Sequence, residues 1–103
     1  MAKVIEKDGV LTLQLSWLEK IGALHGDLSV ASNQLISKSE VPNPWTKEHL
    51  RGTRSPGTAI PYRILLGTMR FKGGKDFCAI YKRTPALIYE FADAEFKRWI
   101  VSI

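Results

Sequence analysis

The stretch YRILLGTMRFKGGKDFCAIYKR, residues 62–83, consists of two apolar runs joined by a pair of glycines. Aromatic and β-branched residues, which favour strands, are frequent in both runs, and the second run alternates from Phe77 onward. A phosphate-binding loop would continue directly into a helix and would have a Ser or Thr after its lysine. Since a strand pattern follows here, we predict that Gly73 and Gly74 form the two-residue turn of a β-hairpin.

Three segments outside this hairpin also have strand character. Residues 8–16 alternate leucine with polar residues, which is typical of a strand with one buried face. Residues 27–41 are predicted to form a strand that is broken or bulged near Ser32 and Asn33. Residues 85–91 follow the hairpin after the short link RTP, so we expect this strand to be its antiparallel neighbour.

A short helix is predicted near residues 17–25. Ser16 and Glu19 have the spacing of a capping box, in which each side chain binds the backbone N–H of the other residue. Gly26 is a typical residue for the end of a helix. The apolar residues that follow the cap at helical spacing are Trp17, Ile21 and Leu24.

Residues 42–61 are predicted to form a long, ordered loop. They contain four prolines and two glycines, and their apolar residues follow no regular period. Trp45, Leu50 and Ile60 are large and apolar, so we expect them to hold the loop against the body of the protein.

The net charge of +5 is concentrated in the middle of the chain, because residues 47–83 contain nine Lys or Arg residues and two acidic ones. A basic segment attracts anionic ligands, here an acidic lipid headgroup or nucleic acid. A solvated face, or arginines that hold the loop through backbone carbonyls, would explain the same charges. The candidate anion-binding residues are Arg51, Arg54, Arg63, Lys72, Lys75, Lys82 and Arg83.

The sequence offers no motif for catalysis, a metal or a cofactor. Cys78 lies among apolar residues of a predicted strand, which favours a small buried core residue over a reactive thiol. His25 and His49 have no Cys or carboxylate at the spacing of metal ligands. We therefore predict a protein that is not an enzyme, with a small enzyme as the least favoured alternative.

The location of the protein is predicted from its single cysteine and its apolar runs. One cysteine cannot form an internal disulfide, the N-terminus lacks the apolar core of a signal peptide, and no run approaches the roughly 20 residues of a membrane span. We expect a single cytoplasmic domain without a transmembrane segment.

Residues 51–91 contain a motif that runs from Arg-x-Pro-Gly-Thr-x-Ile-Pro through a glycine turn to a final proline. Its residues are Arg54, Pro56, Gly57, Thr58, Ile60, Pro61, Gly67, Gly73, Gly74, Arg83 and Pro85. In this motif the chain resembles the bacterial pleckstrin-homology-like domains, most of which are uncharacterised. The resemblance implies that residues 1–103 form one mainly β domain, a partly open antiparallel pleckstrin-homology-like barrel that serves as a platform for binding or assembly.

The C-terminal residues 94–103 fit either a helix or a strand, since their apolar residues satisfy both periods. The resemblance favours a strand, which would leave the family's closing C-terminal helix absent or shortened. The helix predicted over 17–24 could cover the open barrel mouth, whereas a mouth that stays uncovered tends to recruit a second chain. We therefore predict a non-enzymatic module that binds an unidentified protein or assembles into a homo-oligomer, most simply a dimer, with Trp99 or Trp17 near the interface.

Overall fold

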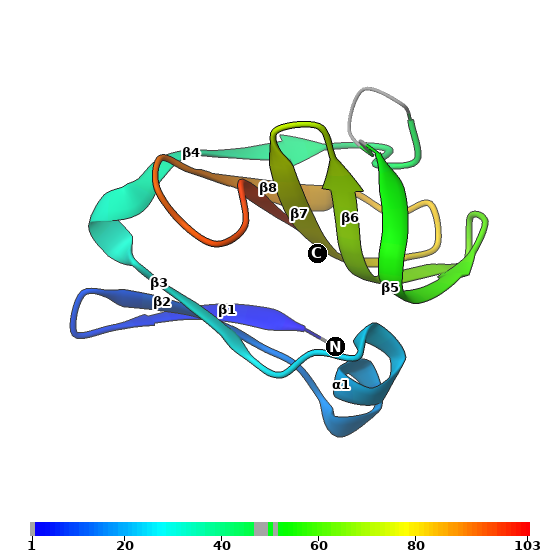
Figure 1. Cartoon of the computed structure of the whole chain (residues 1–103), viewed down its shortest axis with the longest axis horizontal. Coiled ribbons are helices and arrows are strands. Elements are labelled where there is room, and N and C mark those ends of the chain that lie inside the picture. The colour runs from blue at the N-terminus through cyan, green and yellow to red at the C-terminus, as the bar shows by residue number, and fades with distance from the viewer. Residues whose placement is uncertain (1, 47–49, 51) are drawn as a thin grey trace.

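A computed structural model describes residues 2–46, 50 and 52–103, and for residues 53–56 it describes the backbone alone. Figure 1 shows two layers, a six-stranded sheet above and a three-stranded sheet with the helix α1 below. The helical elements are α1 (Trp17–Ala23) and the 3₁₀ turn η1 (Ser32–Gln34). The strands are β1 (Lys3–Lys7), β2 (Val10–Gln14), β3 (Leu28–Ala31), β4 (Leu35–Val41), β5 (Thr53–Ile60), β6 (Ile64–Phe71), β7 (Gly74–Tyr81), β8 (Ala86–Phe91) and β9 (Arg98–Ser102).

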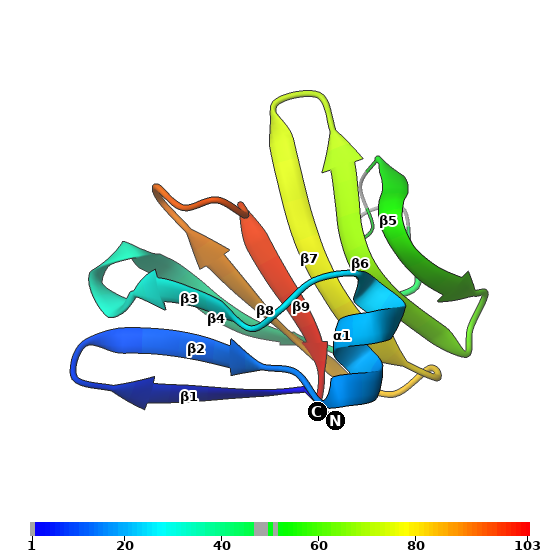
Figure 2. The ribbon, with the colours of Figure 1, turned by 60° about the horizontal axis from the view of Figure 1, so that its bottom comes forward.

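The strands lie in two sheets with the orders β1-β2-β3 and β4-β8-β9-β7-β6-β5. The turn η1 leads the chain from β3 in the small sheet to β4 at one edge of the large sheet, as Figure 2 shows. A mainly β fold with one short α-helix near 17–25 is thus confirmed. The sheets are not antiparallel throughout as predicted, because β7 and β9 pair in parallel.

The strand predicted within residues 8–16 is confirmed by β2 and the residue that follows it. Leu11, Leu13 and Leu15 are buried between the two layers, where they belong to the main core cluster. The break predicted within 27–41 is also confirmed, because η1 separates β3 from β4 at Ser32. Local alternation was sufficient to predict the strand within 8–16.

The central hairpin is confirmed, but its turn lies one residue earlier than predicted. Phe71 pairs with Gly74, so the two loop residues are Lys72 and Gly73. Gly73 has a φ of +105°, which residues with a Cβ avoid. Gly74 belongs to β7, and a Cβ there would lie 2.9 Å from Cγ of the flexible Lys97 side chain.

Replacing Gly73 by alanine should lower the free energy of unfolding by about 1–2 kcal/mol, because alanine resists positive φ. Gly74→Ala should have the smaller effect, since the Lys97 side chain can move aside. Urea unfolding of the two variants beside the parent chain measures both values. A larger loss for Gly74→Ala would contradict this assignment of the turn.

The prediction of a continuous loop over 42–61 is wrong, because its second half forms β5. This strand is at the edge of the large sheet, and its register with β6 shifts between Arg54 and Gly57. An edge position with a bulge tolerates Pro56, which has no N–H to donate. Gly57 packs so closely on β6 that a Cβ would lie 2.2 Å from the carbonyl oxygen of Leu66.

The C-terminal segment forms the strand β9, which lies between β7 and β8. The prediction that the hairpin and the 85–91 strand are neighbours is therefore wrong. Trp99 is buried on one face of β9 and Ile100 on the other. A strand that is apolar on both faces is best buried in the middle of a covered sheet, so β9 displaces β8 from β7.

Each face of the large sheet is covered by apolar side chains. The main cluster lies between the two layers, and a second cluster lies on the outer face of the sheet. Trp45 and Leu50 of the loop pack on this second cluster, as predicted. Ile60 does not hold the loop as predicted, because its side chain is exposed at the end of the edge strand.

Candidate functional site

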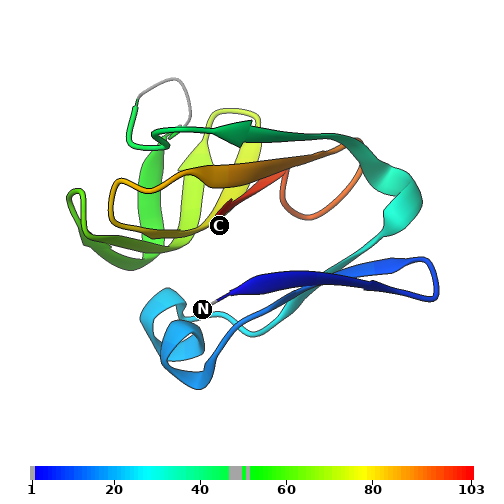
Figure 3. The same ribbon diagram turned by 180° about the vertical axis from the view of Figure 1, so that it is seen from behind.

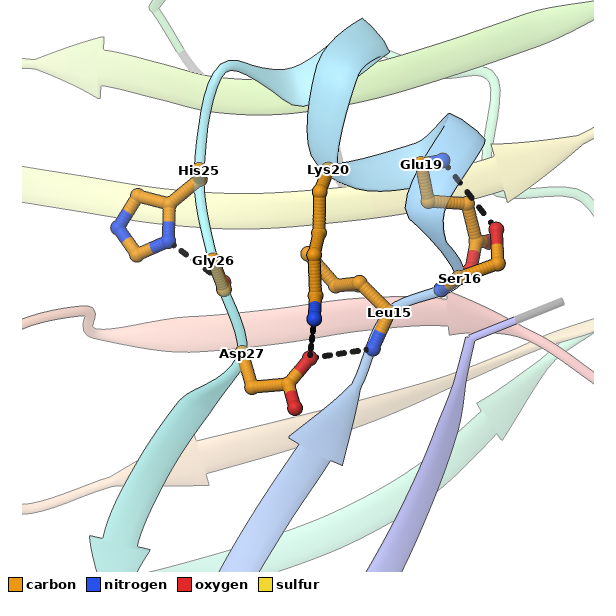
Figure 4. Close-up of polar contacts among 7 residues, drawn as sticks. All are labelled: Leu15, Ser16, Glu19, Lys20, His25, Gly26 and Asp27. Atoms are coloured by element: carbon orange, nitrogen blue, oxygen red, sulfur yellow. Dashed lines mark hydrogen bonds and ion pairs between the residues drawn. The ribbon is translucent and has the colours of Figure 1, made fainter.

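The helix α1 begins at the predicted capping box, which Figure 4 shows in detail. The Ser16 hydroxyl accepts the N–H of Glu19 at 3.2 Å, and Oε1 of Glu19 accepts the N–H of Ser16 at 2.7 Å. The two bonds of the capping box satisfy backbone N–H groups that a free helix start leaves unpaired. At the other end, the helix stops at Ala23, and the cap residue Leu24 has left-handed backbone angles, two residues before the predicted stop at Gly26.

The segment after α1 is held against both the helix and the small sheet (Figure 4). Oδ1 of Asp27 accepts the N–H of Leu15 at 2.9 Å and lies 3.7 Å from Nζ of Lys20. Nδ1 of the His25 imidazole lies 2.8 Å from the carbonyl oxygen of Gly26. The two contacts of Asp27 therefore hold this segment against the helix and against the residue that follows β2.

Glu19 is buried beneath α1 and connects the helix to two distant segments. Its Oε2 accepts the N–H of Ala2 at 2.8 Å and the hydroxyl of Tyr81 in β7. Burial by itself raises the pKa of Glu19, but the hydrogen bonds from Tyr81, Ser16 and Ala2 outweigh it and lower that pKa. Burial and the bond to Glu19 raise the pKa of Tyr81.

Replacing Glu19 by glutamine should cost about 1–3 kcal/mol at pH 7, because an amide cannot accept all these donors. The carboxylate's contribution is complete above the unfolded-state pKa of about 4.3 and is lost as the pH falls through the lower folded-state value. The difference from the parent chain should therefore shrink below about pH 4. Urea unfolding at pH 7 and pH 3 measures it, with Glu6→Gln on exposed β1 as the control. A difference that is equal at both pH values would contradict this role.

The outer face of α1 is apolar, contrary to the usual arrangement of a helix on a protein surface. Its large apolar side chains retain 57–75% exposure, while the inward face consists of Glu19, Gly22 and Ala23. Small residues allow the helix to approach β6 closely, since a Cβ at Gly22 would lie 3.0 Å from Cδ1 of Leu66. The exposed residues, which we call the α1 surface, are Trp17, Leu18, Ile21 and Leu24.

A hollow of about 420 Å³ adjoins the α1 surface between the helix and the large sheet. Leu18 forms one wall, and Ile64 and Leu66 of β6 form another. Thr58 of β5 donates a hydrogen bond to the carbonyl oxygen of Gly22 at 2.7 Å, which closes one side. The helical pattern in the sequence identified three of the four α1-surface residues but not that they face outward.

The predicted anion-binding residues do not form one group. Arg51 lies outside the described residues, and for Arg54 only the backbone position in β5 is described. Lys72 and Lys75 lie at the tip of the β6–β7 hairpin. The other three candidates lie in the turns before β6 and after β7, at the opposite end of the hairpin, and Figure 2 shows where these turns lie. At about 3.3 Å per residue, the length of β7 separates the two groups by more than 20 Å. The three residues at the far end are Arg63, Lys82 and Arg83.

The two groups also differ in their contacts. At the hairpin tip, Nζ of Lys75 lies 3.5 Å from the Glu95 carboxylate and 4.8 Å from the centre of the Phe96 ring. At the other end, the guanidinium of Arg83 lies 4.1 Å from the centre of the Tyr62 ring. An acidic neighbour weakens the attraction of the tip for anions, so the Arg83 end is the better candidate for binding them.

Cys78 is fully buried in the outer core cluster, as predicted, and burial raises the pKa of its thiol further from neutrality. His25 lies on the opposite face of the large sheet. Its ring packs edge-on against the rings of Phe77 and Phe96, with distances of 5.6 and 5.5 Å between the ring centres. His49 is not among the described residues. Throughout residues 2–46, 50 and 52–103, no three His, Cys, Asp or Glu side chains are close enough to hold a metal ion together.

No protein-family model, curated protein or solved structure matches this chain. In the part of the chain that the structure describes, no helix is both long and apolar enough to cross a membrane. The function is therefore inferred from the arrangement of the chain's own residues.

Proposed function

We propose that this chain is a non-enzymatic, pleckstrin-homology-like module that assembles with a second copy of itself through the α1 surface. The observation that favours this function is the cluster of four large apolar side chains exposed on one short helix. Large apolar side chains that are exposed side by side are a typical feature of protein interfaces. The family assignment rests on the Arg54–Pro61 motif and agrees with a mainly β fold.

Two copies related by a two-fold axis would place their α1 helices side by side. In such an interface the same patch is used twice, so Trp17 or Leu18 of one copy can enter the hollow of the other. The charged residues on the helix do not oppose this contact, because Glu19 is buried and Lys20 is near Asp27. Full burial of a large apolar side chain stabilises by about 1.5–3 kcal/mol, so eight of them in two copies can offset the cost of association.

Light scattering between about 1 and 100 μM tests this dimer. The parent chain should have at least twice the mass of 11.6 kDa at the upper end, and the double variant Trp17→Ser with Leu18→Ser should remain monomeric. Ile36→Ser is the control, because Ile36 is similarly exposed, at 62%, but lies on β4 at the far edge of the large sheet. A parent chain that stays monomeric, or a dimer that survives the double substitution, would contradict the proposal.

Trp99, the other residue predicted near the interface, is buried within one chain with 2% exposure. It cannot contact a partner without unfolding of β9, so Trp17 is the tryptophan that the dimer would use. Substitutions of Trp99 should therefore change the stability of the fold rather than its assembly.

A further inference from the structure

A second depression lies on the outer face of the large sheet, away from the α1 surface. Its volume is about 320 Å³, and Leu50, Ala59 and Pro61 line it together with the rings of Trp45 and Tyr62. Trp45 is fixed in place because its indole N–H donates to the carbonyl oxygen of Lys82 at 2.6 Å. We call this depression the Trp45 cleft; it is a preformed apolar pocket at the small end of the range for ligand sites.

Three basic residues, which we call the rim, adjoin residues that line the Trp45 cleft: Arg63, Lys82 and Arg83. The N–H of Lys82 donates to the carbonyl oxygen of Arg63 at 2.8 Å, which joins the two turns at this end of the sheet. Arg83 stacks on the Tyr62 ring, and all three basic side chains are exposed. Among the described residues, no carboxylate forms an ion pair with any of these three cations. The rim is therefore open to an external anion.

The combination of an apolar floor and a cationic rim selects a ligand with an apolar group beside negative charge. A nucleobase needs a flat, open aromatic face for stacking. The Trp45 and Tyr62 rings are 5.7 Å apart and tilted by 55°, and Arg83 covers one face of Tyr62. This geometry suits a rounded aliphatic side chain better than a base.

The edge strand β5 supplies a further reason to expect a peptide. Ala59 belongs to this strand, and Pro61 follows it directly. Pro56 and the bulge interrupt the first part of this edge, but residues 57–60 after them present backbone N–H and C=O groups that an extended chain can pair with, while pockets beside the strand receive alternate side chains. The backbone of a peptide bound along β5 would thus be positioned with its side chains at the Trp45 cleft.

We propose that the Trp45 cleft binds an extended acidic peptide, with an aliphatic side chain in the cleft and flanking carboxylates on Arg63, Lys82 and Arg83. This site is independent of the proposed dimer, because it shares no residue with the α1 surface. Bidentate pairing with carboxylates is the strongest contact available to an arginine on such a rim.

The test uses the full chain and the peptide acetyl-Asp-Glu-Leu-Pro-Leu-Asp-Glu-amide, labelled for fluorescence anisotropy. The ¹⁵N–¹H spectrum should show a shift of the Trp45 indole resonance on binding, identified by its loss in Trp45→Phe. The double variant Arg63→Gln with Arg83→Gln should bind at least tenfold more weakly. The matched double variant Lys72→Gln with Lys75→Gln removes equal charge at the opposite end of β7 and should bind as the parent does. Circular dichroism checks that both variants fold.

Peptides with serine for the three central residues, or lysine for the acidic ones, should bind at least tenfold more weakly. The proposal is overturned if the parent chain does not bind the peptide at low salt. It is also overturned if the two double variants lose affinity equally, since net charge alone would then explain binding. Stronger binding of a 15-nucleotide oligothymidylate, or of phosphatidylserine vesicles, with the same indole shift would assign the cleft to nucleic acid or lipid instead and would likewise overturn it.

Discussion

Replacing Trp99 by alanine should lower the free energy of unfolding by about 3–5 kcal/mol, which is the range for a buried tryptophan that leaves a cavity. Trp99 lies in β9 between the central strands β7 and β8, with 2% of its surface exposed. Its ring packs edge-on against Phe91 at 4.7 Å and lies 6.3 Å from Tyr89. A loss of this size is a large part of the stability of a small domain, so the thermal midpoint should fall steeply.

Trp17→Ala is the matched control for this experiment, because it removes the same side chain from an exposed site. Its effect on urea unfolding should be below about 1 kcal/mol when measured at a concentration at which the chain is monomeric. Equal effects of the two substitutions would show that Trp99 is not the core residue described here. The same data separate core stability from the dimer proposed for the α1 surface.

Asp76→Ala should destabilise the fold by about 3–5 kcal/mol, because it removes the buried carboxylate that pairs with the largely buried Arg98. Asp76 in β7 is opposite Arg98 in β9, and its side chain is 1% exposed. Its Oδ2 accepts hydrogen bonds from Nη2 of Arg98 at 2.9 Å and from Nε at 3.2 Å. The pair thus connects the two parallel strands by a charged contact within the sheet.

A double-mutant cycle measures how far this penalty arises from the loss of the Asp76–Arg98 pair. Asp76→Ala combined with Arg98→Met should be less destabilising than the sum of the two single changes, since the double variant removes both charges of the pair. Chemical denaturation of the four proteins gives the coupling free energy. If the destabilisation of the double variant equals the sum of the two single values, the two side chains contribute independently.

Several elements could be predicted because their signals are local. The capping box needs Ser16 and Glu19 three residues apart, and the β6–β7 hairpin needs a glycine at the turn. The buried leucines of β2 also follow from a period of two in the sequence, and the break at Ser32 lies within the short stretch where it was predicted. In each of them, the signal lies in residues that are close together along the chain.

The candidate site was predictable only in part. The sequence identified Trp17 as a possible interface residue, but the apolar spacing on α1 did not reveal which side faces the sheet. Gly22 and Ala23 were the available signal, because small residues allow close approach of a helix to a strand. The binding of Glu19 to Ala2 and Tyr81 involves residues 17 and 62 positions away, which no local pattern contains.

By itself, then, the sequence determined the mainly β composition, the short capped helix and the central hairpin, because these depend on neighbours along the chain. Tertiary structure decided that β9 lies between β7 and β8, that β5 forms an edge strand despite Pro56, and that Arg83 and Lys72 lie at opposite ends of the hairpin. These outcomes depend on which apolar faces can be buried together. Those faces come from segments far apart in the chain, so no local pattern decides the outcome. Strand order and helix orientation were therefore settled by the burial of Trp99 and Ile100 on two faces of one sheet, and by the close approach that Gly22 permits. Figure 3 shows the result from behind, with the helix and small sheet packed beneath the large one.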